Sequence, residues 1–168
     1  AYKKSSKVKE NWRDIMELKR IIFMGTPEIA SVYLKSLIDT NHNIVAVYSQ
    51  PARKKGRGMH MQESPVQMIA EKNSIKTFTP TEFISKINKK EIEELLPDLI
   101  IVMGYGLKLP QHILQLPTLG CINIHVSLLP RWRGAAPIEH ALLNGDKETG
   151  ITIFKLVQEM DAGPILAK

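Results

Sequence analysis

The sequence predicts an α/β domain built on a mainly parallel β-sheet. Continuous apolar runs alternate with segments whose apolar residues recur at helical spacing, which is the pattern of βαβ units. The chain has 168 residues, of which 43% are hydrophobic and 24% charged. That composition is typical of a globular domain, and the length suits a single hydrophobic core.

In the first half, apolar runs predict strands at residues 20–24 and 44–48. Helices are expected at 28–38 and 65–72, the first with Thr26 as N-cap and Pro27 as its first helical residue. Residues 49–64, rich in Lys, Arg and Gly, are expected to form a loop. Between residues 83 and 96, apolar side chains again recur at helical spacing.

In the second half, strands are expected at residues 98–103, 120–124 and 151–156, with a last one starting at 164. A short helix is expected at 111–116 and a longer one at 137–143, closed by an Asn-Gly pair. Ligands of open α/β sheets bind beyond the carboxyl ends of the strands. Segments that follow strand ends are therefore expected to converge on one site, namely Gly25, Ser49, Gly104, His125 and the loop at 157–161.

Asn123 and His125 are the strongest candidates for chemistry. Residues two apart in a strand share a face, so both side chains can point at one site. An amide N–H suits developing negative charge, and a histidine titrates near neutral pH. Asp161, in a Gly-flanked loop, can orient the histidine. For an isolated Asn-x-His pattern the commoner interpretation is structural: a strand-end Asn, a packed His and an Asx turn at the Asp.

A longer pattern favours the catalytic interpretation. Residues 123–138, N-I-H-V-S-L-L-P-R-W-R-G-A-A-P-I, resemble the signature of the folate-dependent formyltransferases. The tail of this run is most similar to the branch that formylates methionyl-tRNA. The resemblance runs from about Arg20 to the end of the chain, through F-M-G-T-P-E at 23–28, Q-P at 50–51, G-R-G at 56–58, G-Y-G at 104–106 and D-A-G at 161–163.

This resemblance implies a Rossmann-like formyltransferase fold and transfer of a formyl group from 10-formyltetrahydrofolate to the α-amine of methionyl-initiator tRNA, at the start of translation. It assigns catalysis to Asn123, His125 and Asp161. Walls of the folate pocket are implied at Ser127, Leu128, Leu129, Pro130, Tyr105, Leu107, Val157 and Glu159. Two alternatives stay open: a formyltransferase of the same fold acting on an amino sugar or other small amine, and an inactive truncated remnant that binds folate or RNA.

The cations Arg53, Lys54, Lys55 and Arg57 form a basic segment, interrupted by glycine, that can follow a phosphate backbone. The resemblance implies that this segment binds tRNA, although a solvated charge run is the usual interpretation of such a pattern. The formal net charge of +6 favours an anionic partner without identifying one. The sequence after the first strand lacks the G-x-G-x-x-G pattern, so a nicotinamide cofactor is not expected.

Residues 1–18 are expected to be a polar, basic N-terminal extension. Residues 19–168 are expected to be a catalytic domain that is incomplete at its C-terminus, without the β-barrel-like domain of relatives. The single cysteine, Cys121, is expected in the core and fits a reducing compartment: the cytoplasm of a bacterium or the mitochondrial matrix of a eukaryote. We expect a monomer, with neither a metal site nor a membrane segment.

Overall fold

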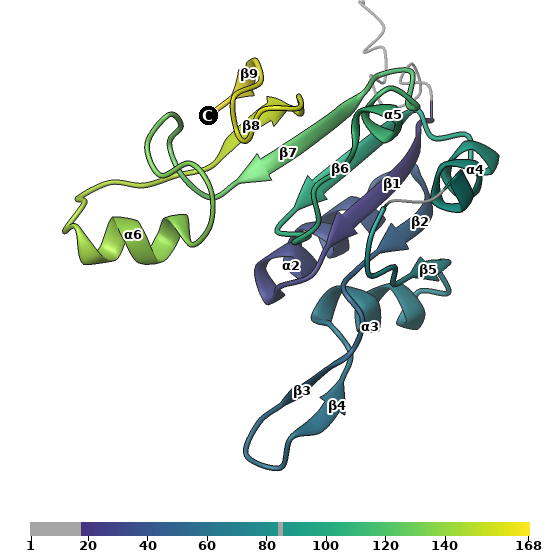
Figure 1. Ribbon diagram of the computed structural model, residues 1–168, viewed down its shortest axis with the longest axis horizontal. Helices are drawn as coiled ribbons and strands as arrows, with labels where there is room; N and C mark the ends of the chain where they lie inside the picture. Colours follow the sequence, from purple (N-terminus) through teal and green to yellow (C-terminus); the bar gives the residue numbers. More distant parts are fainter. Residues whose placement is uncertain (1–17, 84–85) are drawn as a thin grey trace, which may run out of the picture.

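The computed structural model describes residues 18–83 and 86–168. The expected N-terminal extension therefore lies, apart from Leu18, outside the described residues. Within them, seven strands form one sheet in the order β5-β2-β1-β6-β7-β8-β9, shown in Figure 1. The strands are β1 (Arg20–Gly25), β2 (Asn43–Tyr48), β5 (Thr77–Phe78), β6 (Leu99–Met103), β7 (Cys121–His125), β8 (Thr152–Lys155) and β9 (Ile165–Ala167).

The strands from β5 to β7 are parallel, whereas β8 runs antiparallel to β7 and β9 antiparallel to β8. The prediction of a mainly parallel sheet is confirmed. Helical segments connect the parallel strands and cover both faces, as the alternating pattern indicates. These helices are α2 (Glu28–Ile38), α3 (Pro65–Lys72), α4 (Lys86–Glu94) and α5 (Gln111–Leu114). A further helix, α6 (Pro137–Leu143), lies between β7 and the antiparallel strand β8.

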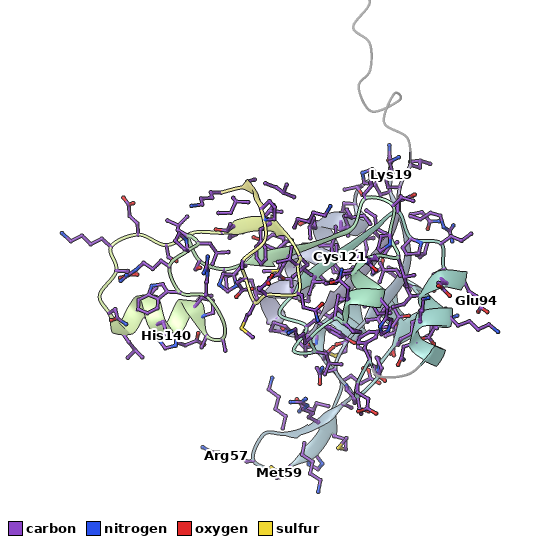
Figure 2. The ribbon with its side chains drawn as sticks, turned by 45° about the horizontal axis from the view of Figure 1, so that its top comes forward. Lys19, Arg57, Met59, Glu94, Cys121 and His140 are labelled. Atoms are coloured by element: carbon purple, nitrogen blue, oxygen red, sulfur yellow. The ribbon has the colours of Figure 1, made fainter. Side chains whose placement is uncertain are left out.

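Two hydrophobic clusters pack on opposite faces of the sheet. Alternate residues of β1 divide between them: Ile21 and Phe23 face α2 and α3, whereas Ile22 and Met24 face α4 and α5. Cys121, at the start of β7, is buried in the α4/α5 cluster, and Figure 2 shows it deep within the molecule. Because side chains alternate along a strand, the residues two and four positions after Cys121 share its face.

Two local predictions are wrong, and one short strand was not predicted. Thr26 does not cap α2: Pro27 occupies the N-cap position, and the Thr26 hydroxyl donates to the Tyr105 carbonyl at 3.0 Å. The segment at 49–64 is not simply a loop, because it contains an antiparallel hairpin of β3 (Arg53–Lys55) and β4 (His60–Gln62). The two-residue strand β5 was not predicted, since two residues are too short to show a periodicity.

The hairpin and α6 are the two parts that stand apart from the sheet (Figure 1). α6 carries exposed leucines at Leu142 and Leu143. None of the helices in the described part of the chain has the length and apolarity that a membrane crossing needs.

Candidate active site

A cavity of about 650 Å³ lies at the carboxyl ends of β1, β6 and β7. This volume is within the range of roughly 300–1,000 Å³ that small-molecule sites occupy. Its walls come from the turn after β1, the segment after β6, the end of β7, the start of α6 and the segment between β8 and β9. The site therefore lies where the rule for open α/β sheets predicts.

Asn123, His125 and Asp161 all line this cavity. Asn123 is half-buried near the end of β7, and His125 is the last residue of that strand, with only 8% of its surface exposed. Their spacing places both side chains on the face of the sheet that Cys121 shares. The sequence-predicted trio is thus brought together around one space.

Both ring nitrogens of His125 face an oxygen atom. Nε2 lies 2.8 Å from the carbonyl oxygen of Trp132. Because a carbonyl only accepts, Nε2 carries the hydrogen in this arrangement. Nδ1 faces Asp161 Oδ2 at 3.8 Å, which is too long for a direct hydrogen bond but close enough for charge attraction. A water molecule can bridge a gap of this size.

Asp161 is held by its own backbone geometry and by a neighbouring loop. Its Oδ2 accepts the backbone N–H of Gly134 at 2.7 Å, and its φ of +47° lies in the left-handed region, which aspartate tolerates better than most residues. Its side chain is 12% exposed. Asp161 thus links the segment after β7 to the segment after β8.

The route by which Asp161 reaches the site differs from the expected one. The antiparallel register pairs Lys155, the last residue of β8, with Ile122 near the start of β7. The carboxyl end of β8 therefore lies beside the start of β7, at the opposite end of that strand from His125. The segment after β8 must run back along β7 before it reaches the histidine. Asp161 therefore meets His125 as expected, but not because β8 ends near the site.

The predicted folate residues divide into two groups. Tyr105, Leu107, Val157 and Glu159 line the cavity. Tyr105 is 1% exposed, and its side chain belongs to the α4/α5 cluster, where burial raises the pKa of its phenol. Tyr105 therefore presents little surface to the cavity.

The other four, Ser127 to Pro130, are not among the residues that line this cavity. The Ser127 hydroxyl donates to the Arg131 carbonyl at 2.6 Å, and the Leu129 N–H donates to the hydroxyl of Thr152 at 3.0 Å. Leu128 lines a separate hollow of about 150 Å³. These hydrogen bonds show a structural use for the segment, and its contact with folate stays a prediction.

The backbone groups that contact the site residues could not be predicted from the sequence. The Trp132 carbonyl and the Gly134 N–H contact His125 and Asp161, yet every residue type offers a backbone carbonyl and almost every type an N–H. Gly104 does carry a signal, because glycine adopts positive φ readily. Its φ is +56°, and a Cβ there would approach Pro27 Cγ to 2.9 Å, so Gly104 keeps this wall of the cavity open.

The predicted tRNA-binding cations lie on the β3–β4 hairpin. Arg53, Lys54 and Lys55 form β3, and Arg57 lies in the turn; all four are exposed. Figure 2 shows Arg57 at the hairpin tip, well away from the sheet. These cations therefore lie on a different part of the molecule from Asn123, His125 and Asp161. In the described part of the chain, no group of His, Cys, Asp and Glu is suited to hold a metal ion.

This chain is similar to known proteins in sequence and in fold. The formyl transferase family model matches residues 19–168. A methionyl-tRNA formyltransferase of Pseudomonas fluorescens is 49% identical over 149 residues, which are 89% of this chain and 47% of that protein. One from Legionella pneumophila is 47% identical over 148 residues, with 88% and 47% coverage.

A phosphoribosylglycinamide formyltransferase structure from Anaplasma phagocytophilum superposes with a TM-score of 0.70 at 27% identity, over 89% of this chain and 70% of that one. The chain thus spans about half the length of the curated relatives it matches, at 47%.

Proposed function

This chain belongs to the formyl transferase family, and from that premise we propose that it transfers a formyl group from 10-formyltetrahydrofolate to the α-amine of methionyl-initiator tRNA. The observation that carries the proposal is the meeting of Asn123, His125 and Asp161 at one cavity. A formyl transfer needs an oxyanion donor and groups that manage protons, and these three side chains supply both.

In the proposed reaction, the neutral amine attacks the formyl carbon and a new C–N bond forms. The carbonyl oxygen becomes an oxyanion, which the Asn123 amide N–H stabilises. The amine then loses a proton, the bond from the formyl carbon to the folate nitrogen breaks, and that nitrogen gains a proton. The product is an N-formylated amine and tetrahydrofolate.

His125 and Asp161 manage the protons in this scheme. The hydrogen on His125 Nε2 is held by the Trp132 carbonyl, so Nδ1 is the nitrogen available for exchange. Asp161 Oδ2 faces Nδ1 at 3.8 Å, a gap that one water molecule can bridge. A water molecule between them would carry the proton from the attacking amine toward the leaving nitrogen.

The cavity also has the character that a folate ring system requires. Apolar side chains from the segment after β6, from α5 and from the β8–β9 segment form much of its wall, with the backbone of the Gly104–Gly106 turn between them. Flat heteroaromatic ligands bind between apolar walls with a few oriented polar groups. We propose that Leu107, Val157 and Glu159 contact the folate, together with the backbone of Tyr105.

The basic hairpin supports tRNA over a small amine as the acceptor. Four exposed cations on one projecting β-ribbon suit a phosphate backbone, whereas a small amine has no phosphates for them to contact. The names of the relatives from Pseudomonas and Legionella point in the same direction. The proposed reaction belongs to translation initiation, in the bacterial cytoplasm or the mitochondrial matrix.

The test is a formyl transfer assay with 10-formyltetrahydrofolate and methionyl-initiator tRNA, run on this chain and on Asn123→Ala. Loss of one oxyanion donor costs about 100-fold to 1,000-fold in rate, so the variant should make almost no product while still binding folate. Formylation of a small amine by this chain, without formylation of the tRNA, would instead support the amino-sugar alternative. Absence of any product, with folate bound, would refute activity of this polypeptide.

A further inference from the structure

We propose that Asp146 is a positioning residue for His125, and that it acts by holding the Trp132 backbone carbonyl against the histidine ring. This inference rests on the proposed function, because it concerns the orientation of the proposed proton-transfer group. Asp146 itself lies outside the residues that line the catalytic cavity. The orientation of His125 depends on Trp132, the backbone of Trp132 is unfavourable, and Asp146 anchors that residue.

The Trp132 carbonyl selects one form of His125. Neutral imidazole carries its hydrogen on either nitrogen, and the two forms have comparable energies in water. The 2.8 Å contact between Nε2 and the Trp132 oxygen stabilises the form with hydrogen on Nε2. Nδ1 then points its lone pair toward Asp161, as proton exchange with that carboxylate requires. Displacement of the carbonyl would remove this preference.

Trp132 does not hold its own position. Its φ of +58° is in the left-handed region, which is unfavourable for a bulky residue. Gly134 and Ala136 also have positive φ, at +87° and +54°, so the segment after β7 turns sharply several times. Such conformations persist where surrounding contacts hold them. The segment therefore needs an anchor.

Asp146 supplies that anchor through three hydrogen bonds. Its Oδ2 accepts from Trp132 Nε1 at 2.6 Å and from Arg131 Nε at 2.7 Å, and its Oδ1 accepts from Arg131 Nη2 at 2.6 Å. The Arg131 guanidinium also lies over the Trp132 ring, 4.4 Å from its centre, and the His140 ring stacks on the indole at 5.3 Å. One carboxylate thus holds Trp132, whose carbonyl contacts the histidine, and Arg131, the residue before it.

The Asp146 carboxylate stays ionised over the whole pH range in which an enzyme works. Hydrogen bonds from Arg131 and Trp132 lower the pKa of Asp146 to about 2. The Asp146 side chain is only 12% exposed, whereas that of Arg131 is 57% exposed. An ion pair with one partner so exposed contributes little to global stability, so its main consequence is local geometry.

The proposal predicts the behaviour of Asp146→Asn. An asparagine keeps the size but turns one oxygen into an NH₂ group, which then faces N–H donors and accepts from none of them. Nitrogen-15 NMR of the imidazole, with His125 assigned through a His125→Gln sample, should show the Nε2–H form in the parent chain and a mixture of both forms in Asp146→Asn. The turnover number should fall about 10-fold to 100-fold, as misplacement of a catalytic group does, while KM for the folate changes little.

All spectra are compared at one pH, because the ionisable side chains of Asp161, Glu159 and Lys108 line the same cavity as His125. Glu94→Gln is the matched control: Glu94 forms an exposed pair with Lys90 on α4 at 3.8 Å. This control should leave both the histidine spectrum and the turnover number as in the parent chain.

Trp132→Phe provides a second variant, since it keeps an aromatic ring for stacking and removes only the Nε1–H donor. It should shift the His125 spectrum in the same direction by a smaller amount, and it keeps the test decisive where Asp146→Asn does not fold. An unchanged His125 spectrum in the folded variants would overturn the proposal. A rise in KM for the folate as large as the fall in turnover number would also overturn it. The spectrum needs no substrate, so a parent chain that makes no product would refute the proposed function alone.

Discussion

The basic hairpin yields a prediction that the sequence alone does not make. Side chains alternate across a strand, and β3 pairs with β4 in the register Arg53 to Gln62, Lys54 to Met61 and Lys55 to His60. Arg53 and Lys55 therefore share one face of the hairpin, and Lys54 lies on the other. We therefore expect Arg53 and Lys55 to contact a stretch of phosphate backbone that Lys54 does not contact.

The structure identifies which face belongs to the cavity. Arg53 Nη2 donates to Gln50 Oε1 at 2.7 Å, and Gln50 packs beside Gly106, where an added Cβ would lie 3.7 Å from the Gln50 amide nitrogen. Gly106 is part of the cavity wall. An RNA whose aminoacyl end enters the cavity is thus expected to pass along the face of Arg53 and Lys55.

The perturbation is Lys55→Ala compared with Lys54→Ala. Each phosphate contact contributes about 0.7–0.9 to the slope of log affinity against log salt concentration, so Lys55→Ala should lower the slope by this amount. Between about 50 and 200 mM KCl, the affinity of the variant should therefore fall roughly threefold less than that of the parent chain. Lys54→Ala should leave the slope nearly unchanged.

The assay is fluorescence anisotropy of labelled initiator tRNA, titrated at several KCl concentrations. Lys90→Ala is the control, because Lys90 is an exposed lysine on α4 with a weak pair at 3.8 Å. Equal slope changes for Lys54→Ala and Lys55→Ala would refute the assignment of faces. A larger change for Lys54→Ala would place the RNA on the opposite face.

Three further predictions concern the site and the core. Asp161→Asn keeps a hydrogen-bond acceptor and tolerates the positive φ at this position, but it removes the charge that faces the histidine. Turnover should fall on the order of 100-fold at unchanged melting temperature, and normal turnover would exclude Asp161 from proton transfer. Burial raises the pKa of the Cys121 thiol to about 12, so Ellman's reagent at pH 8 should label only the unfolded chain. The buried Cys121 thiol stabilises the fold below pH 9, and this contribution is lost as pH rises toward 12, because the thiol of the unfolded chain ionises first. Urea unfolding at pH 8 and pH 11 tests for this loss. Gly104→Ala adds a Cβ 2.9 Å from Pro27 Cγ, whereas Gly56→Ala meets nothing within 4 Å at a similarly positive φ, so chemical denaturation should show a greater loss for Gly104 than the roughly 1–2 kcal/mol of the left-handed conformation alone.

The helices were the most predictable elements of the fold. The bounds of α2, α3 and α6 match the predicted ranges, because Pro marks or precedes their first residues and polar residues follow their last ones. These are local signals, carried by residues next to one another in the chain. The failure at Thr26 has the opposite origin: its hydroxyl is bonded to the Tyr105 carbonyl, 79 residues away.

The catalytic trio was predictable for two different reasons. Asn123 and His125 share a face by strand geometry, which the sequence contains. Asp161 was expected beside them because its loop follows a strand and because of the resemblance. The first reason does not apply, since β8 is antiparallel to β7 and the segment after it returns along β7 to the histidine. The direction of a strand depends on which neighbour it pairs with, and apolar periodicity is the same in either direction.

The order of elements, the apolar faces of the strands and the residue types needed for formyl transfer are properties of short stretches of this chain. The pairing of β8 with β7, the two faces of the hairpin and the anchor at Asp146 depend on contacts between distant residues. The form of His125 depends on a backbone carbonyl that any residue type supplies. For that reason the sequence identifies the histidine as a candidate, and only the folded chain decides which of its two nitrogens bonds to the Trp132 carbonyl.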